Sequence, residues 1–335
     1  MTRRIGAKAG SLHVKQTDDG LHLADSILWF DSQDSGDLSF LSSATTTFHP
    51  KVPQVIATEE TIKILEAYRK KPNALICQYN RPFSIGRLKM ELLPSGCVLG
   101  GASLYVETDK ARLLYAPQLQ PHRIPTVRQM QLKRANTLVL GAYHPDPHQA
   151  MPNRKKEKDR LIEVVRDFMA QGLFPTIVCE PVATAQEITK LLCDHAVPVA
   201  CHEAIFKVNN VYEAYGSKLG TYSRFSPKHV KQKVSLFPLP GRKGASMRAT
   251  LPDGPVIYVE STAEVSPTSA VARQVVERIH IASTCDGPEI REIIAAVGPK
   301  ELYFFGPYAK RYVEELGSTV PVIKPLFAND QPTLF

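Results

Sequence analysis

The spacing of apolar residues along this chain changes at about residue 141. Before that point, short runs alternate or are continuously apolar and are broken by Pro and Gly, as in GLHLADSILWFDS at 20–32. Such runs predict the strands of a sheet. The segment 87–117 predicts three strands joined by turns, and 136–143 predicts a short buried strand. One helix is predicted at 59–71, where Ile62, Leu65 and Tyr68 have helical spacing.

After residue 141, helical and strand patterns take turns. Helical spacing covers 156–172, 184–195 and 203–216, and short apolar runs at 174–181 and 198–203 lie between them. Strands that alternate with helices predict a parallel α/β unit. The polar, Pro- and Gly-rich segment 216–255 predicts loops or weak strands. A strand pattern resumes at 254–262, and then a helix, a strand and a helix are predicted up to residue 317.

These changes predict one α/β domain that is interrupted by another. We expect the first domain to comprise 1–140 and 256–326, the inserted α/β domain to comprise 141–255, and a polar tail to occupy 327–335. At 335 residues the chain is long enough for two such cores.

The charge of the chain favours an anionic binding partner. The formal net charge is +8, and the basic residues are clustered. Clusters of this kind are the usual footprint of a polyanion, although a well-solvated surface gives the same pattern. No apolar run is long enough for a membrane span. The basic N-terminus has no apolar run behind it, and the six cysteines are scattered without a CxxC pair, so we expect a cytoplasmic protein with reduced thiols and no membrane partner.

Six stretches of the sequence match motifs of one known family in the same order along the chain. They are GLHLADSILWFDS (20–32), SSATTTF (42–48), LPSGCVLGGASLYVE (93–107), RLLYAPQLQ (112–120), PVACHEAIFKVNNVYEAYG (198–216) and ASTCDGPEIREIIAAVGPKELYFFGPYAKRYVEELG (282–317). Together they resemble the metallo-β-lactamase-fold nucleases with a β-CASP insertion, above all the DNA-ligase-associated exonucleases and the mRNA 3′-end-processing factors. The match is collinear over almost the whole chain. It implies a metallo-β-lactamase αββα sandwich with an inserted α/β β-CASP domain.

The resemblance also shows where the family's metal ligands would stand. In this chain those positions carry Ser43, Thr45, Thr47, Phe48, Cys97, Gln118, Gly141, Thr284 and either Phe305 or Gly306. Only Asp286 of the family's S-D-H-x-D segment is kept. The family's chemistry needs two metal ions about 3.5–4 Å apart. Hydroxyl groups and phenyl rings do not supply the imidazole and carboxylate ligands of such ions. The sequence therefore predicts a pseudo-nuclease with no catalytic residues and no cofactor.

Two other groups of residues leave a different metal site open. His144, Asp146 and His148 lie within five residues, and the bland alternative is a proline-stiffened loop. Cys193, His195, Cys201 and His202 are also close in sequence, but His202 matches a family position in the insertion, which favours packing. Asp286 with Ser283 is interpreted as a helix cap.

Binding would survive the loss of catalysis. In the active relatives a nucleic acid strand lies between the two domains, and phosphate contacts supply much of such affinity. The basic residues expected to contact DNA or RNA are Lys133, Arg134, Arg154, Lys155, Lys156, Arg242 and Lys243. Tyr143, Tyr222, Phe225 and Phe237 are candidate stacking faces, with core packing as the alternative.

The sequence ends in QPTLF, which resembles the Q-x-x-L-F pentapeptide that binds the bacterial sliding clamp. Gln331 would make polar anchor contacts, and Leu334 and Phe335 would fill an apolar pocket of the partner. Alternatively, Leu334 and Phe335 pack onto their own domain.

We therefore expect an inactive nuclease-like protein that binds DNA and is recruited to the clamp in repair or replication, with other proteins of those pathways as possible partners. The alternatives are an active hydrolase with a rebuilt metal site and a scaffold that binds protein.

Overall fold

The first part of the fold consists of two sheets packed face to face. The computed structural model of the chain describes residues 12–17, 20–32, 36–45, 53–68, 71–227, 232–239, 251–261, 272–317 and 320–326. Sheet A contains, in spatial order, β1 (Val14–Thr17), β2 (Gly20–Leu23), β3 (Leu28–Phe30), β4 (Leu38–Phe40), β5 (Gln54–Ala57) and β6 (Ala74–Ile76). Sheet B contains β19 (Val322–Pro325), β18 (Glu301–Phe305), β11 (Thr137–Gly141), β10 (Arg112–Ala116), β9 (Ala102–Glu107), β8 (Leu88–Pro94) and β7 (Phe83–Ile85).

The facing sides of sheets A and B form one apolar core. Phe30, Phe40 and Ile56 of sheet A pack against residues of sheet B such as Leu104 and Tyr115. Because successive side chains of a strand point to opposite faces, the other face of each sheet needs its own cover.

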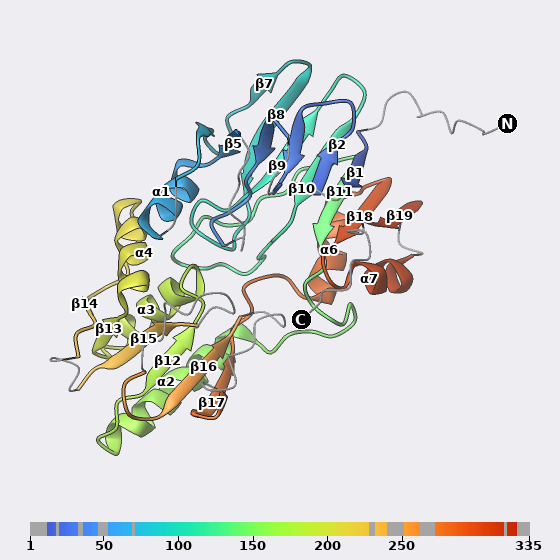
Figure 1. Cartoon of the computed structure of the whole chain (residues 1–335). Helices are drawn as coiled ribbons and strands as arrows, with labels where there is room; N and C mark the ends of the chain where they lie inside the picture. The colour runs from blue at the N-terminus through green and yellow to red at the C-terminus, as the bar shows by residue number, and fades with distance from the viewer. Residues whose placement is uncertain are drawn as a thin grey trace.

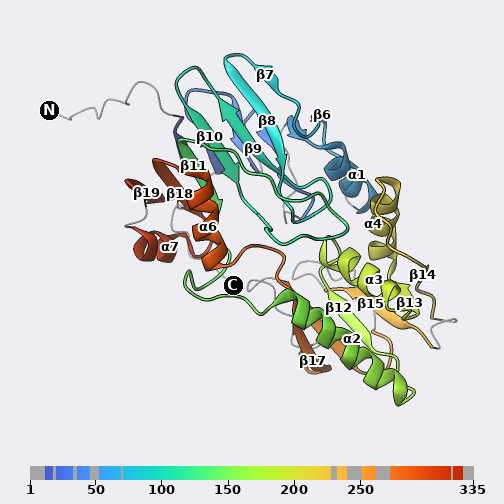
Figure 2. The ribbon, with the colours of Figure 1, turned by 180° about the vertical axis from the view of Figure 1, so that it is seen from behind.

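Helices supply that cover. Helix α1 (Glu59–Tyr68) packs on the outer face of sheet A, and α6 (Gly287–Val297) and α7 (Ala309–Leu316) pack on the outer face of sheet B. Figures 1 and 2 show the resulting order of layers, with the two sheets between helices. The predicted αββα sandwich is confirmed.

A third sheet, sheet C, forms the inserted part of the chain. Its strands are all parallel and lie in the order β14 (Tyr222–Arg224), β13 (Val199–Cys201), β15 (Val234–Pro238), β12 (Thr176–Cys179), β16 (Val256–Glu260) and β17 (Val275–His280). Helices α2 (Arg154–Ala170) and α3 (Thr184–Asp194) pack on one face of this sheet, and α4 (Glu203–Ala214) joins them there through Ile205. The parallel α/β unit expected from the alternating pattern is present.

Strand pairing corrects the expected end of the insertion. The strand at 256–260 was assigned to the first domain, but β16 pairs with β12 through Thr176↔Val256 and belongs to sheet C, as does β17. The chain returns to the first domain only at α6. The segment 216–255 also holds more order than its polar composition predicted, since all five residues of β15 are buried between β12 and β13.

The two parts meet through apolar side chains. Val208 and Tyr212 of α4 pack with Ile62 and Leu65 of α1 and with Leu99 of the β8–β9 loop. The backbone N–H of Leu99 donates to the hydroxyl oxygen of Tyr212 at 3.1 Å. Figure 1 shows α1 and α4 side by side at this junction. Along the described part of the chain, no helix combines the length and the apolar character that crossing a membrane requires.

Candidate functional site

The described positions that match the family's metal ligands come together at one end of the sandwich. They follow the carboxyl ends of β4, β8, β10, β11 and β18 or precede α6. Gln118, Gly141 and Thr284 line the same small cavity, which has room for about one water molecule (≈ 10 Å³). The hydroxyl groups of Ser43 and Thr45 lie 2.7 Å apart, and the Thr45 hydroxyl donates to Oε1 of Gln118 at 3.1 Å. Thr47 and Phe48 lie outside the described residues.

Packing fills the position where the family has an acidic residue. A Cβ atom added to Gly141 would lie 2.3 Å from the carbonyl oxygen of Pro117 and 2.3 Å from Cε2 of Tyr143. The Tyr143 ring packs edge-on against Phe305, with ring centroids 6.2 Å apart. Phe305 in turn stacks on Tyr115 at 5.8 Å. Aromatic rings therefore occupy the ends of β10, β11 and β18, and no side chain fits at residue 141 in this backbone.

A carboxylate that contacts this aromatic group is Asp31, at the end of β3. Its Oδ1 accepts from the backbone N–H of Ser42 at 2.8 Å, and its Oδ2 accepts from the Tyr115 hydroxyl at 2.8 Å. Burial raises the pKa of this carboxyl group above its ordinary value, although both hydrogen bonds oppose the shift. Both oxygens already hold partners, so Asp31 serves to fix the Ser42 backbone and the Tyr115 ring.

The two thiols at the site are held in the protonated form. Cys97 is buried, its Sγ lies 3.8 Å from the carbonyl oxygen of Ser95, and burial raises its pKa to about 12. Burial also raises the pKa of Cys285 well above its ordinary range. A metal-binding cysteine has to be a thiolate.

The donor atoms at the described positions thus do not fit a pair of metal ions. They are hydroxyls, an amide and a buried thiol, beside aromatic rings. Across the described ranges there is no group of three or more His, Cys, Asp and Glu side chains that could hold a metal ion. Asp286, the one kept acidic residue, is the N-cap of α6. Its Oδ1 accepts from the Glu289 N–H at 3.0 Å and its Oδ2 from the Met151 N–H at 2.9 Å, so the predicted helix cap is confirmed.

The side chains of the His144–His148 loop turn to separate partners. His144 is buried and its Nδ1 lies 2.9 Å from the carbonyl oxygen of Asp146. His148 lies between Arg291, at 2.7 Å, and Glu315, at 2.9 Å. This arrangement is the proline-stiffened loop that was the alternative to a metal site.

The second histidine and cysteine group is likewise divided. His202 is the N-cap of α4, and its Nδ1 accepts from the Ala204 N–H, whereas His195 is the C-cap of α3. Cys201 is buried beside Thr189 and Asn209. Each residue is explained by its own element.

One expected nucleic-acid contact is wrong. Arg154, the first residue of α2, is buried, and its Nη2 donates to both carboxylate oxygens of Glu187 at 2.8 and 2.7 Å. Lys158 also pairs with Glu187. This ion triplet ties α2 to α3, so the Arg154 side chain is not available to a strand at the surface.

The other basic residues lie in different settings. Lys155 and Lys156 are exposed in the first turn of α2, and Arg134 is exposed in the segment before β11. Lys133 pairs with Glu91 at 2.6 Å and lies over the ring of Tyr105. Arg242 and Lys243 lie outside the described residues, as do Gln331, Leu334 and Phe335.

The aromatic rings proposed to stack on bases mostly pack against other side chains of this chain. Phe237 is buried and meets Phe225 edge-on at 4.8 Å, Tyr222 packs against Phe206, and Tyr143 packs against Phe305. Core packing, the alternative for these rings, explains them better than base stacking does.

Comparison with known proteins finds two weakly similar curated proteins and a solved structure of similar fold. No profile of a known protein family matches the chain. It is 20% identical over 303 residues to a probable DNA ligase of Opitutus terrae, covering 89% of this chain and 29% of the relative. It is 22% identical over 184 residues to an RNase J-like protein of Methanocaldococcus jannaschii, covering 50% of this chain and 44% of the relative. The chain thus spans less than half the length of either curated relative.

A solved structure supports the fold alone. The crystal structure of a protein of unknown function from Enterococcus faecalis aligns with a TM-score of 0.57 at 15% identity, over 80% of this chain and 74% of that one. The two weak relatives, and not this structure, support the superfamily that the sequence resembles.

Proposed function

We propose that this chain is a catalytically inactive, nuclease-like protein that binds DNA and is recruited to the replication sliding clamp in DNA repair or replication. The names of the two relatives support a nucleic-acid role. The observation that carries the loss of catalysis is the packing at Gly141, where Pro117 and the Tyr143 ring fill the place of an acidic ligand. No metal cofactor is part of this proposal.

The test of inactivity combines a nuclease assay with elemental analysis. Untagged protein is incubated with single- and double-stranded DNA in added Mg²⁺, Mn²⁺ or Zn²⁺, and bound metal is measured after gel filtration. We expect no strand cleavage and no stoichiometric metal. One to two equivalents of zinc, with cleavage abolished by His144→Ala, would overturn the proposal in favour of a hydrolase with a rebuilt metal site.

The nucleic-acid partner is argued from charge. Lys155, Lys156 and Arg134 are exposed, and no ion pair involves them in the described part of the chain. The phosphate backbone is the target that such cations recognise without regard to sequence. Binding that does not weaken with salt would favour the rival proposal, a scaffold for proteins. RNA serves as well as DNA in this argument, so both belong in the binding assay.

Recruitment to the clamp rests on the Q-x-x-L-F pattern of Gln331, Leu334 and Phe335. Two apolar side chains and one amide are the usual anchors of a short peptide in a pocket. We expect micromolar affinity for a purified bacterial sliding clamp, near ~8 kcal/mol. Replacing Leu334 and Phe335 with alanine should abolish that binding and leave the melting temperature unchanged. A lower melting temperature would mean that the two side chains pack onto their own domain.

A further inference from the structure

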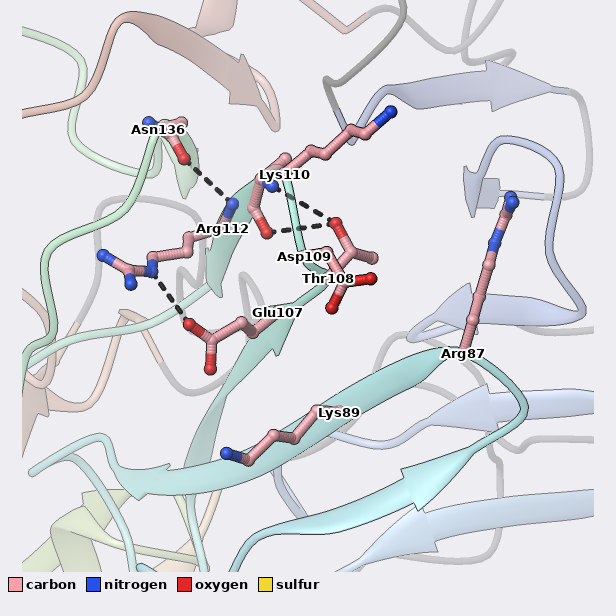
Figure 3. A pocket seen from close by; sticks show the side chains of 9 residues that line it. Arg87, Lys89, Glu107, Thr108, Asp109, Lys110, Arg112 and Asn136 are labelled. Atoms are coloured by element: carbon pink, nitrogen blue, oxygen red, sulfur yellow. Dashed lines mark hydrogen bonds and ion pairs between the residues drawn. The ribbon is translucent and has the colours of Figure 1, made fainter.

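A polar pocket lies at the end of sheet B farthest from the candidate site. It has a volume of about 470 Å³ and is formed by the β7–β8 turn, the β9–β10 turn and the residue before β11 (Figure 3). Strand β8 enters the candidate site at its other end, beyond Pro94, so the pocket and the site are separated by the length of the strand. Figure 1 shows this end of the sandwich pointing away from sheet C.

The charges of the pocket are arranged in a row across three neighbouring strands. Lys89 of β8 is directly opposite Glu107 of β9, which is directly opposite Arg112 of β10. Arg112 is fixed in place, because its Nε donates to Glu107 at 2.9 Å and its backbone N–H donates to Oδ1 of Asn136 at 3.0 Å. Glu107 is therefore already neutralised by a cation within the pocket.

The remaining cations have no such partner. Arg87, Lys89 and Lys110 are exposed around the pocket, and no ion pair involves them in the described part of the chain. Arg87 does donate through its Nη2 to the backbone carbonyl oxygen of Asp25 at 3.5 Å, so Lys89 and Lys110 are the cations that the proposal depends on. Asp109 is the only other carboxylate of the described lining. With four cations against two carboxylates, the pocket has a formal charge of +2. An excess of cations over carboxylates attracts an anion from solution.

Beyond the pocket, the same face of β8 carries an ion pair. Glu91 is two residues beyond Lys89 and so lies on the same face of the strand, about 7 Å further along. Lys133 pairs with it at 2.6 Å and covers the Tyr105 ring, and the exposed Arg134 follows. Of these residues, Arg134 is the cation that has no ion pair in the described part of the chain.

We propose that this pocket binds closely spaced phosphate groups and is a second contact for the nucleic acid, a proposal that rests on the function proposed above. Phosphate oxygens suit its lining, because lysine and arginine side chains and the Asn136 amide offer donors, whereas large apolar side chains are absent from its described lining. A free polyphosphate shares this chemistry, and the experiment separates the two sources.

The test compares two double variants. Lys89→Ala with Lys110→Ala removes two pocket cations. Lys310→Ala with Lys324→Ala removes two exposed cations from α7 and β19, at the opposite edge of the same sheet, and is the matched control. Binding of a labelled single-stranded oligonucleotide is followed by fluorescence anisotropy between low and physiological salt, and binding of tripolyphosphate by calorimetry.

For the pocket variant we expect an oligonucleotide Kd about tenfold higher at low salt, and a log K against log salt slope shallower by about 1.4, or about 0.7 for each lost contact on a single strand. The control should behave like the unmodified chain. Loss of tripolyphosphate binding with unchanged oligonucleotide binding would keep the pocket as a phosphate site and assign it to a free polyphosphate. If neither ligand is affected, or if the control loses as much, the pocket is only a solvated surface. In that case DNA binding through α2 would still stand, whereas an unmodified chain that binds no oligonucleotide contradicts the proposed function itself.

Discussion

Arg154, Lys155 and Lys156 are three consecutive basic residues with two different roles. Arg154 is enclosed between α2 and α3 and holds both oxygens of Glu187, whereas the two lysines after it face solvent. From the sequence alone the three residues look like one surface cluster, because their charge does not show which side of α2 packs against another helix. Arg154 is buried because Glu187, thirty-three residues further along the chain, lies beside it in the folded structure.

Replacing Arg154 with alanine should therefore act on stability. The change leaves the Glu187 carboxylate buried with Lys158 as its only ion-pair partner in the described chain. We expect the free energy of unfolding to fall by about 3 kcal/mol. This is the lower end of the range for a broken buried ion pair, because Lys158 still neutralises part of the Glu187 charge. Urea denaturation measures it. Lys155→Ala, one residue further along, is the control and should change the value by less than about 0.5 kcal/mol. Equal effects from both variants would mean that Arg154 is not buried.

Asp31 should make stability depend on pH. Its carboxyl group is partly buried, and burial raises its pKa, so the folded chain holds the proton more tightly than the unfolded chain. The stability that this proton contributes is complete below the ordinary value of 3.8 and is lost as the pH rises through the raised pKa. Asp31→Asn removes the titration.

The measurement is the free energy of unfolding of both chains from pH 4 to pH 8. We expect the difference, unmodified chain minus Asp31→Asn, to decrease as the pH rises and then to level off. A difference that increases with pH would show that the bonds from Ser42 and Tyr115 to the carboxylate outweigh the cost of burying its charge.

Elements with strong periodicity were predictable, and long-range pairings were not. The helices α2, α4 and α6 and the three strands of 87–117 form where the apolar spacing put them. Strand β16 was also found, yet it was assigned to the wrong sheet, because the spacing of a strand does not say which strand it pairs with. Strand β15 lies in the segment that predicted loops or weak strands, because the segment is largely polar, yet the neighbouring strands bury all five of its residues. The positions that gather at the candidate site could be found only through the resemblance, since no local pattern links Ser43, Gln118 and Thr284.

The end of strand β11 should not accept any side chain at residue 141. Gly141→Ala would place a methyl group against the Pro117 carbonyl at the end of β10 and against the Tyr143 ring. Backbone atoms have little room to move, so we expect a loss of about 1–3 kcal/mol from overpacking. Thermal and urea unfolding measure it.

The comparison variant for Gly141 is Gly172→Ala. An added methyl group there meets no atom within 4 Å, but the backbone has a φ of +75°, so only a conformational cost of about 1 kcal/mol applies. A Gly141→Ala chain as stable as the unmodified one would mean that residue 141 has room for an acidic ligand, which would contradict the proposed loss of the metal pair.

At the scale of the whole molecule, the αββα sandwich and the insertion are held together by an apolar junction, and the described cations discussed above, which have no ion pair among the described residues, lie elsewhere. Val208 and Tyr212 of α4 close the junction against α1 and Leu99. The exposed lysines of α2 and the pocket at the far end of sheet B are surfaces that this packing does not use. Binding of a polyanion can therefore be weakened without loosening the fold.

Because the exposed lysines of α2 take no part in the junction, their removal should affect binding and not stability. Lys155→Ala with Lys156→Ala should weaken binding of a single-stranded oligonucleotide and make the log K against log salt slope shallower by about 1.4, because each lost phosphate contact removes about 0.7. The unfolding midpoint should stay unchanged, since both side chains are exposed and only the Lys156 backbone N–H, which donates to Asn153, belongs to the helix cap. Anisotropy titrations at several salt concentrations measure the slope, with Lys310→Ala plus Lys324→Ala as the control for the loss of two charges. An unchanged affinity would mean that the first turn of α2 is a solvated surface, and the nucleic acid would then have to bind through the remaining cations of the molecule alone.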